Sequence, residues 1–204
     1  MAEPPQDTYE GGPEERRKAA IRSIASRGVR VEEKEPAHFA VLENVDAGLE
    51  ESIKCGAPLP VAIVVDSRYF EGRDDLTHFA RYSAEKNIIS LNQRSKIFRV
   101  GMADAHFFMK RYREIEYTST GSVMHAIRHE LSHCTHWHHD RKSYAINDFE
   151  DPSHRELAIS QVSRYASEAP PELVAEVRAA LLDGRHFSDE VMNLYLHYSG
   201  GLTR

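Results

Sequence analysis

The chain has 204 residues, of which 28% are charged and 41% apolar, and a formal net charge of −6. This length suits one domain with its own core, and the composition is that of a soluble globular protein. The acidic balance argues against a nucleic-acid-binding protein, whose surface is typically basic. No apolar run approaches the ~18 residues that span a bilayer, and residues 1–18 contain no hydrophobic signal core. We therefore expect no nucleic-acid or membrane partner, and a protein that is cytoplasmic or exported by a route independent of a signal peptide.

The first half of the chain predicts alternating helices and strands. Residues 1–12 are rich in Pro, Gly and acidic residues and indicate a disordered tail, so a single domain is expected over 13–204. Apolar periodicity predicts the following elements: a helix from Pro13 to about Arg27, an edge strand over 29–35, a helix over 39–54, a buried strand over 61–65, a strand over 87–91 and a helix over 102–113. The polar segment 68–86 predicts a surface loop or flap.

The second half is expected to be mainly helical. Hydroxyl groups at 118–121 could cap a helix that runs from about Ser122 to Trp137. A polar loop is expected over 138–153. Three helical segments should follow: one near 154–163, one from Pro171 to Leu182 and one from the capping residue Ser188 to about Tyr198. The predicted fold is α+β, with a small mixed β-sheet packed on helix 122–137 and a mainly helical C-terminal part.

Histidines are concentrated on the expected helix 122–137 and just after it. Five of the 12 histidines fall within eleven residues: His129, His133, His136, His138 and His139. The apolar residues of this helix share a separate stripe: Val123, Ile127, Leu131 and Cys134. At 100° per residue the two stripes face different directions, so one side of the helix packs and the other presents imidazoles.

Residues 129–133 read His-Glu-Leu-Ser-His, which is an HExxH motif. Histidines four apart lie on one helix face about one turn apart, so both can bind one metal ion at ~2.0–2.1 Å. Glu130, between them, projects toward the same cavity and can take a proton from a metal-bound water. The motif predicts that His129 and His133 bind one zinc ion per chain and that Glu130 is the general base.

A catalytic zinc ion takes three protein ligands and a water, so a third ligand is needed. His139 stands where an HExxHxxGxxH motif has its third histidine, but His136 occupies the place of the glycine that turns the chain. Without that turn, His139 lies ~9 Å beyond His133 along the helix, and His136 lies ~10.5 Å from His129. The better candidate is Glu172, because a carboxylate in the first turn of a later helix, 39 residues after His133, resembles the gluzincin arrangement.

The segment SRYASEAPPELVAEV (163–177) resembles the C-terminal signature of anthrax lethal factor-like zincins. In those proteins a tyrosine stands seven residues before the ligand glutamate, which opens an E-aromatic-aromatic-A-E helix. Tyr165 and Glu172 keep this spacing, whereas leucine and valine replace the two aromatic residues. Similar pairs of HExxH and E-x-x-A-E motifs occur in zincins of phages, of bacterial polymorphic toxins and of plasmid antirestriction systems. The resemblance covers about residues 121–203 and implies a zincin-like, gluzincin-type metallopeptidase.

The same resemblance implies that Tyr165 donates a hydrogen bond to the oxyanion of the tetrahedral intermediate. The alternative is a tyrosine that only packs in the core. For Glu176, one turn after Glu172, two interpretations stay open: a hydrogen bond to a ligand histidine, or a solvated helix glutamate. The strand of residues 87–93 could be an edge strand that pairs with a peptide substrate, or an ordinary sheet strand. Three later histidines are expected to be exposed: His136, His138 and His139.

The predicted function is zinc-dependent hydrolysis of a protein or peptide substrate, which the resemblance associates with toxins, effectors or phages. One alternative is an antirestriction-type zincin, which the acidic balance disfavours. The other is a catalytically silent domain that holds structural zinc and acts as an interaction module. A structural zinc site is closed by four protein ligands, so an open fourth position would favour catalysis.

Overall fold

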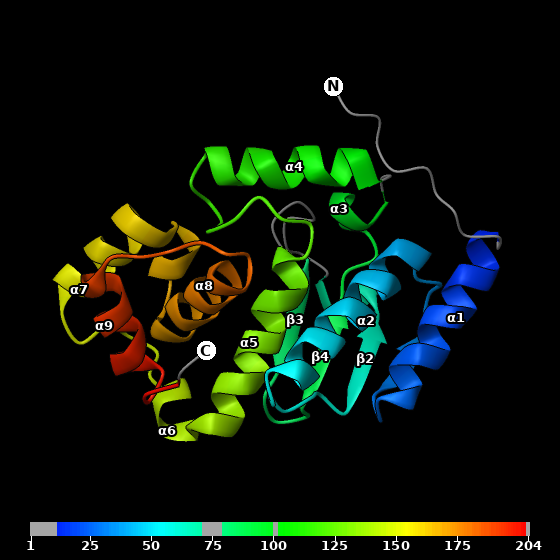
Figure 1. Cartoon of the computed structure of the whole chain (residues 1–204), viewed down its shortest axis with the longest axis horizontal. Helices are drawn as coiled ribbons and strands as arrows, with labels where there is room; N and C mark the ends of the chain where they lie inside the picture. Colours follow the sequence, from blue (N-terminus) through cyan, green and yellow to red (C-terminus); the bar gives the residue numbers. More distant parts are fainter. Residues whose placement is uncertain (1–11, 71–78, 100–101, 203–204) are drawn as a thin grey trace.

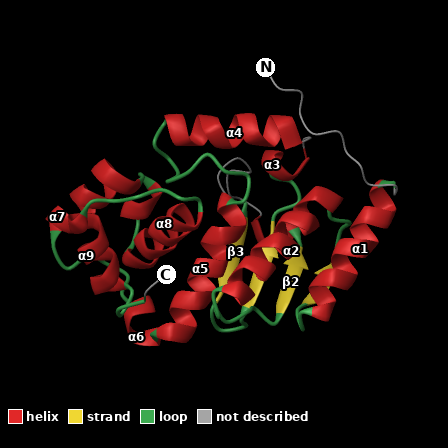
Figure 2. Ribbon diagram, in the orientation of Figure 1, coloured by secondary structure: helices red, strands yellow, loops and turns green. Residues whose placement is uncertain are grey.

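The structure is a computed structural model that describes residues 12–70, 79–99 and 102–202. Within them, a small mixed sheet and a larger set of helices form an α+β fold, as predicted (Figures 1 and 2). The expected disordered tail lies outside the described residues except for its last residue, Gly12, so that expectation stays a prediction. Of the helices described, none is long and apolar enough to cross a bilayer.

The sheet has four strands, β1 (Arg30–Glu33), β2 (Ala62–Val65), β3 (Ala80–Ser83) and β4 (Ile88–Leu91), in the order β1-β2-β4-β3. β1 and β4 pair with β2 in parallel, and β3 pairs with β4 antiparallel. All four residues of β2 are buried, as a continuous apolar run predicts for an inner strand. The prediction that the first strand lies at an edge is also confirmed.

One prediction about the sheet is wrong. The segment 68–86, expected to be a loop, contains most of the short 3₁₀ turn η1 (Ser67–Phe70) and all of strand β3, while residues 71–78 lie outside the described part. β3 has a polar sequence and is defined by its pairing with β4, which sequence periodicity does not reveal. Because β4 is paired on both sides, the segment 87–93 does not supply an edge, and its ordinary-strand alternative is right.

Helices α1 (Pro13–Ser26), α2 (Phe39–Lys54) and α5 (His125–His139) lie side by side over one face of the sheet (Figure 1). The helix α4 (Met102–Glu114), after the short α3 (Lys96–Arg99), lies across the end of this layer. Apolar side chains of α1, α2, α4 and α5 share one core with the sheet, and the stripe residues Ile127, Leu131 and Cys134 belong to it. The predicted apolar face of the motif helix is therefore confirmed.

The C-terminal part is built from short and long helical segments: α6 (Arg141–Tyr144), α7 (Pro152–Leu157), the π-helical turn η2 (Ala158–Val162), the 3₁₀ turn η3 (Tyr165–Ser167), α8 (Pro170–Leu182) and α9 (Asp189–Tyr198). α6 lies in the segment 138–153, so the loop predicted there is wrong in part. Its N-cap is Asp140, which accepts a hydrogen bond from the Lys142 amide. Ser188 caps α9, as predicted. Side chains of η2, α8 and α9 form a second core, and α8 packs along α5.

Candidate metal centre

Helices α5 and α8 bring the three predicted metal ligands together. His129 and His133 come from consecutive turns of α5, and Glu172 comes from the first turn of α8, after the prolines that open it. The Nε2 atom of His129 lies 2.9 Å from Oε2 of Glu172 and 3.0 Å from Nε2 of His133, which is 3.2 Å from the same oxygen. Two atoms bound to one tetrahedral zinc ion lie ~3.3 Å apart, so these residues fit such an ion.

The charges of this cluster depend strongly on one another. Burial raises the pKa of Glu172, but the imidazoles of His133 and His129 outweigh burial and hold that pKa far below its ordinary value. Burial lowers the pKa of His129, but the carboxylates of Glu172 and Glu176 outweigh it and raise that pKa well above its ordinary value. The site therefore stabilises positive charge between its carboxylates, as a metal centre must.

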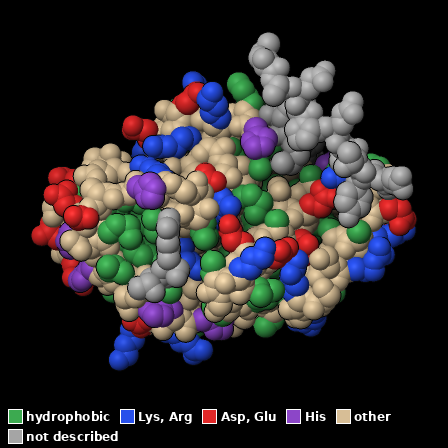
Figure 3. All heavy atoms as spheres, in the orientation of Figure 1, with side chains coloured by type: hydrophobic (Ala, Val, Ile, Leu, Met, Phe, Trp, Pro, Cys, Tyr) green, Lys and Arg blue, Asp and Glu red, His purple; other side chains and the backbone are tan. Residues whose placement is uncertain are grey.

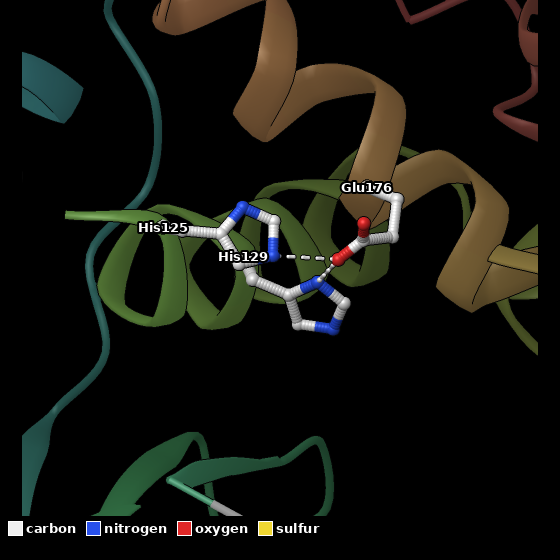
Figure 4. A group of neighbouring side chains, drawn as sticks. All are labelled: His125, His129 and Glu176. Atoms are coloured by element: carbon white, nitrogen blue, oxygen red, sulfur yellow. Dashed lines mark hydrogen bonds and ion pairs between the residues drawn. The ribbon is translucent and has the colours of Figure 1, made fainter. Parts of the chain in front are cut away.

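Glu176, also on α8, is fully buried and receives four hydrogen bonds. Its Oε1 lies 3.0 Å from Nδ1 of His129 and 2.7 Å from Nε2 of His125, and Figure 4 shows it reaching both rings. Its Oε2 accepts from the Ser119 amide at 2.6 Å and from the Ser163 hydroxyl at 2.9 Å. The first interpretation of Glu176 is right: its carboxylate accepts the Nδ1 proton of His129, so Nε2 is the ring atom that can bind a metal in place of its own proton.

Two groups of the described residues have ligand atoms close enough to hold one metal ion. The first is His129, His133 and Glu172, and the second is His125, His129 and Glu176. The second group is fully buried and its carboxylate also accepts from the Ser119 amide and the Ser163 hydroxyl, whereas the Glu172 side chain of the first is 23% exposed. We therefore assign the centre to the first group. Sequence reasoning missed His125, although its place one turn before His129 was the available signal.

The carboxylate of Glu130 lies beside this centre and is buried. Its Oε2 accepts a hydrogen bond of 2.5 Å from the backbone amide of Tyr82, on the edge strand β3. Among the described residues, none forms a hydrogen bond with its Oε1. One oxygen is thus anchored by the sheet and the other can accept a proton, a combination that suits a general base.

Two phenols flank the centre. The ring centroid of Tyr165, in η3, lies 5.4 Å from that of His129, and the ring centroid of Tyr144, at the end of α6, lies 5.8 Å from that of His133. Burial raises the pKa of both phenols, and the carboxylates of the centre raise it further, so both hydroxyls are neutral donors near pH 7. Tyr144 was missed because it lies where the sequence predicted a polar loop.

The predicted exposure of the later histidines is right for His138 and His139 and wrong for His136. His136 is fully buried, with its ring centroid 5.3 Å from that of Tyr144. Burial lowers the pKa of His136 to about 4, so its ring is neutral near pH 7. His139 contacts the carbonyl oxygen of Gly200, with Nε2 at 3.1 Å. Neither His136 nor His139 belongs to the metal centre, as helical spacing predicts.

A small pocket of about 30 Å³ adjoins the centre and is lined by side chains that include His129, Glu130 and Tyr165. Such a volume holds a water molecule or a very small group. Comparison of the chain with protein-family models, with curated proteins and with solved structures found no match. The functional assignment therefore depends on the residues and their geometry.

Proposed function

We propose that this chain is a zinc-dependent metallopeptidase that hydrolyses peptide bonds in a protein or peptide substrate. The observation that carries the proposal is the convergence of His129, His133 and Glu172, with the carboxylate of Glu130 beside them. In the described part of the chain, no fourth side chain joins this group. That supports a catalytic centre with an open position rather than a structural site closed by four ligands.

Each residue has a distinct part in the proposed reaction. Zinc at this centre would polarise the substrate carbonyl and lower the pKa of a bound water. Glu130, held by the Tyr82 amide, accepts a proton from that water and passes it to the leaving amine. Tyr165 donates a hydrogen bond to the carbonyl oxygen of the substrate as negative charge develops there.

The context that we propose is a toxin-like, effector or phage-associated protease, because the motif pair resembles those of such zincins. An antirestriction role would call for a surface that attracts nucleic acid. Figure 3 instead shows acidic side chains gathered over α7 and α9, and the net charge is −6. This distribution supports a protein substrate over a nucleic acid partner.

The test is the mapping of new protein N-termini after a proteome is incubated with the zinc-loaded protein. We expect the wild type to generate new N-termini and Glu130→Gln to lower their rate of formation by ~10²–10⁴, because an amide cannot accept the proton. Both proteins should retain zinc. Glu190→Gln, at an exposed glutamate of α9, is the matched control and should cleave as the wild type does. Equal cleavage by wild type and Glu130→Gln, or none by either, contradicts the proposal.

A further inference from the structure

The side of the α5–α8 pair that faces away from the metal centre holds a larger pocket of about 410 Å³. At 100° per residue, Thr135 lies 200° around α5 from His133, and Arg178 lies 200° around α8 from Glu176. The turn of residues 55–58 completes the wall. None of the described residues that line this pocket is acidic, although the whole chain has a net charge of −6.

Arg178 is the unusual member of this lining. Only 5% of it is exposed, and its Nε is buried without a hydrogen-bond partner. No hydrogen bond or ion pair joins its guanidinium to another described residue, and Tyr195 is its neutral neighbour. Two less buried arginines have hydrogen-bond partners. Arg128 forms ion pairs with Glu51 and Asp183, and Arg185 donates to three backbone carbonyls. Because a buried charge without a partner is strongly destabilising, Arg178 calls for a balancing anion.

We propose that this pocket binds a small molecule through an oxyanion, a carboxylate or phosphate group, that pairs with the guanidinium of Arg178. The planar guanidinium donates two parallel hydrogen bonds to either group. The exposed imidazoles of His138 and His139 line the same pocket and bring further ring nitrogens. The hydroxyl of Thr135 already donates to the Leu131 carbonyl at 2.8 Å, so it can only accept from a ligand.

The volume of the pocket limits the kind of ligand. About 410 Å³ is far more than a bare ion needs and falls within the range of small-molecule sites. The oxyanion is therefore one end of an organic molecule, and its remainder extends past the imidazoles toward solvent. The site uses none of the metal ligands, so it does not depend on the proposed peptidase activity.

The test measures Tm, the temperature of thermal unfolding, for the full chain. Phosphate or acetate serves as the probe and replaces chloride at constant ionic strength. A ligand that binds only the folded protein raises Tm, by about 3–6 °C at ten times its Kd for a chain of this size. We expect this rise in the wild type and in Arg22→Met, which removes an exposed arginine of α1. Arg178→Met should lose at least two thirds of it. The probe that raises the Tm of the wild type more, relative to Arg178→Met, identifies the preferred oxyanion.

The variant also controls for anions that bind elsewhere. Arg178→Met keeps every residue of the metal centre, so a phosphate effect at that centre would persist in it. Without either probe, its Tm should equal or exceed that of the wild type, because an unpaired buried charge is replaced by an apolar side chain. An equal rise in Arg178→Met, or no rise in the wild type with either probe, overturns the proposal. If Arg178→Met does not fold, Arg178→Lys decides: we expect at most half of the rise, and an unchanged rise overturns the proposal.

Discussion

On one face of the α5–α8 pair the carboxylates of Glu130, Glu172 and Glu176 crowd around histidines, and on the other face the guanidinium of Arg178 is buried without a carboxylate. The same two helices thus carry excess negative charge on one side and an unbalanced positive charge on the other. Buried charges that the chain itself does not balance indicate ligands of opposite sign. We therefore expect a cation at the first face and an anion at the second, and variants that act on one face only test the two expectations separately.

The largest effect should come from the ligands of the metal face. His133→Ala and His129→Ala should abolish stoichiometric zinc binding, and Glu172→Ala should weaken it, because each removes one of three converging atoms. Zinc content after gel filtration measures this. His139→Ala, on the far end of α5, is the control and should keep one zinc per chain. Full zinc retention by His133→Ala, or zinc loss in His139→Ala, would show that the centre is assigned to the wrong residues.

The motif could be assigned from sequence because its geometry is local: residues four apart on a helix meet whatever the rest of the fold does. Glu172 lies 39 residues away and was found through the chemistry of its helix start and through the resemblance. His136 and Arg178 were not recognised as special. His136 is buried against Tyr144 of α6, a helix that the sequence predicted as loop. Arg178 lies in a pocket walled by the turn at 55–58, which comes from distant sequence.

The next effect concerns catalysis on the metal face. Tyr165→Phe should lower the catalytic rate by ~10²–10³ with zinc content unchanged, the typical loss for one oxyanion donor. Tyr144→Phe keeps the ring that packs edge-on against His133 and removes only the hydroxyl, so we expect less than about a threefold loss. Steady-state kinetics on a cleaved peptide compares them. If the large loss appeared in Tyr144→Phe instead, the oxyanion role would pass to that phenol.

A smaller effect should come from the buried carboxylate that supports His129. Glu176→Gln replaces an acceptor of four hydrogen bonds by an amide that can accept at only one atom. We expect zinc affinity to fall by about 10–100-fold, the usual loss when the partner of a ligand histidine is removed. Competition with a chromophoric chelator, at temperatures where the variant is folded, measures it. Glu190→Gln is the control, and equal affinities of the two variants would contradict the supporting role.

Strand β3, like the pocket at Arg178, could not be predicted from the sequence. β3 has the sequence Ala-Arg-Tyr-Ser and only its backbone pairing with β4 makes it a strand. Pairing between strands is a long-range property, so composition indicated a loop. That strand supplies the amide that anchors Glu130, which means that the role of the general base was predicted whereas its support was not.

The smallest effect on zinc affinity is expected from two adjacent glycines after α9, which should change stability alone and which offer a matched pair. Gly200 and Gly201 both have positive φ, 65° and 83°. An alanine at either position should therefore lose about 1–2 kcal/mol from backbone strain. A Cβ at Gly200 would in addition lie 2.5 Å from Oδ2 of Asp140, the N-cap of α6, whereas at Gly201 nothing lies within 4 Å. Relieving that contact displaces the cap, so Gly200→Ala should be less stable than Gly201→Ala by about a further 1–3 kcal/mol in urea unfolding.

Both variants should keep zinc affinity within twofold, because Gly200 contacts the end of α5 beyond the ligand turns. A tenfold loss of zinc affinity in Gly200→Ala alone would show that α6 couples the turn after α9 to the metal centre.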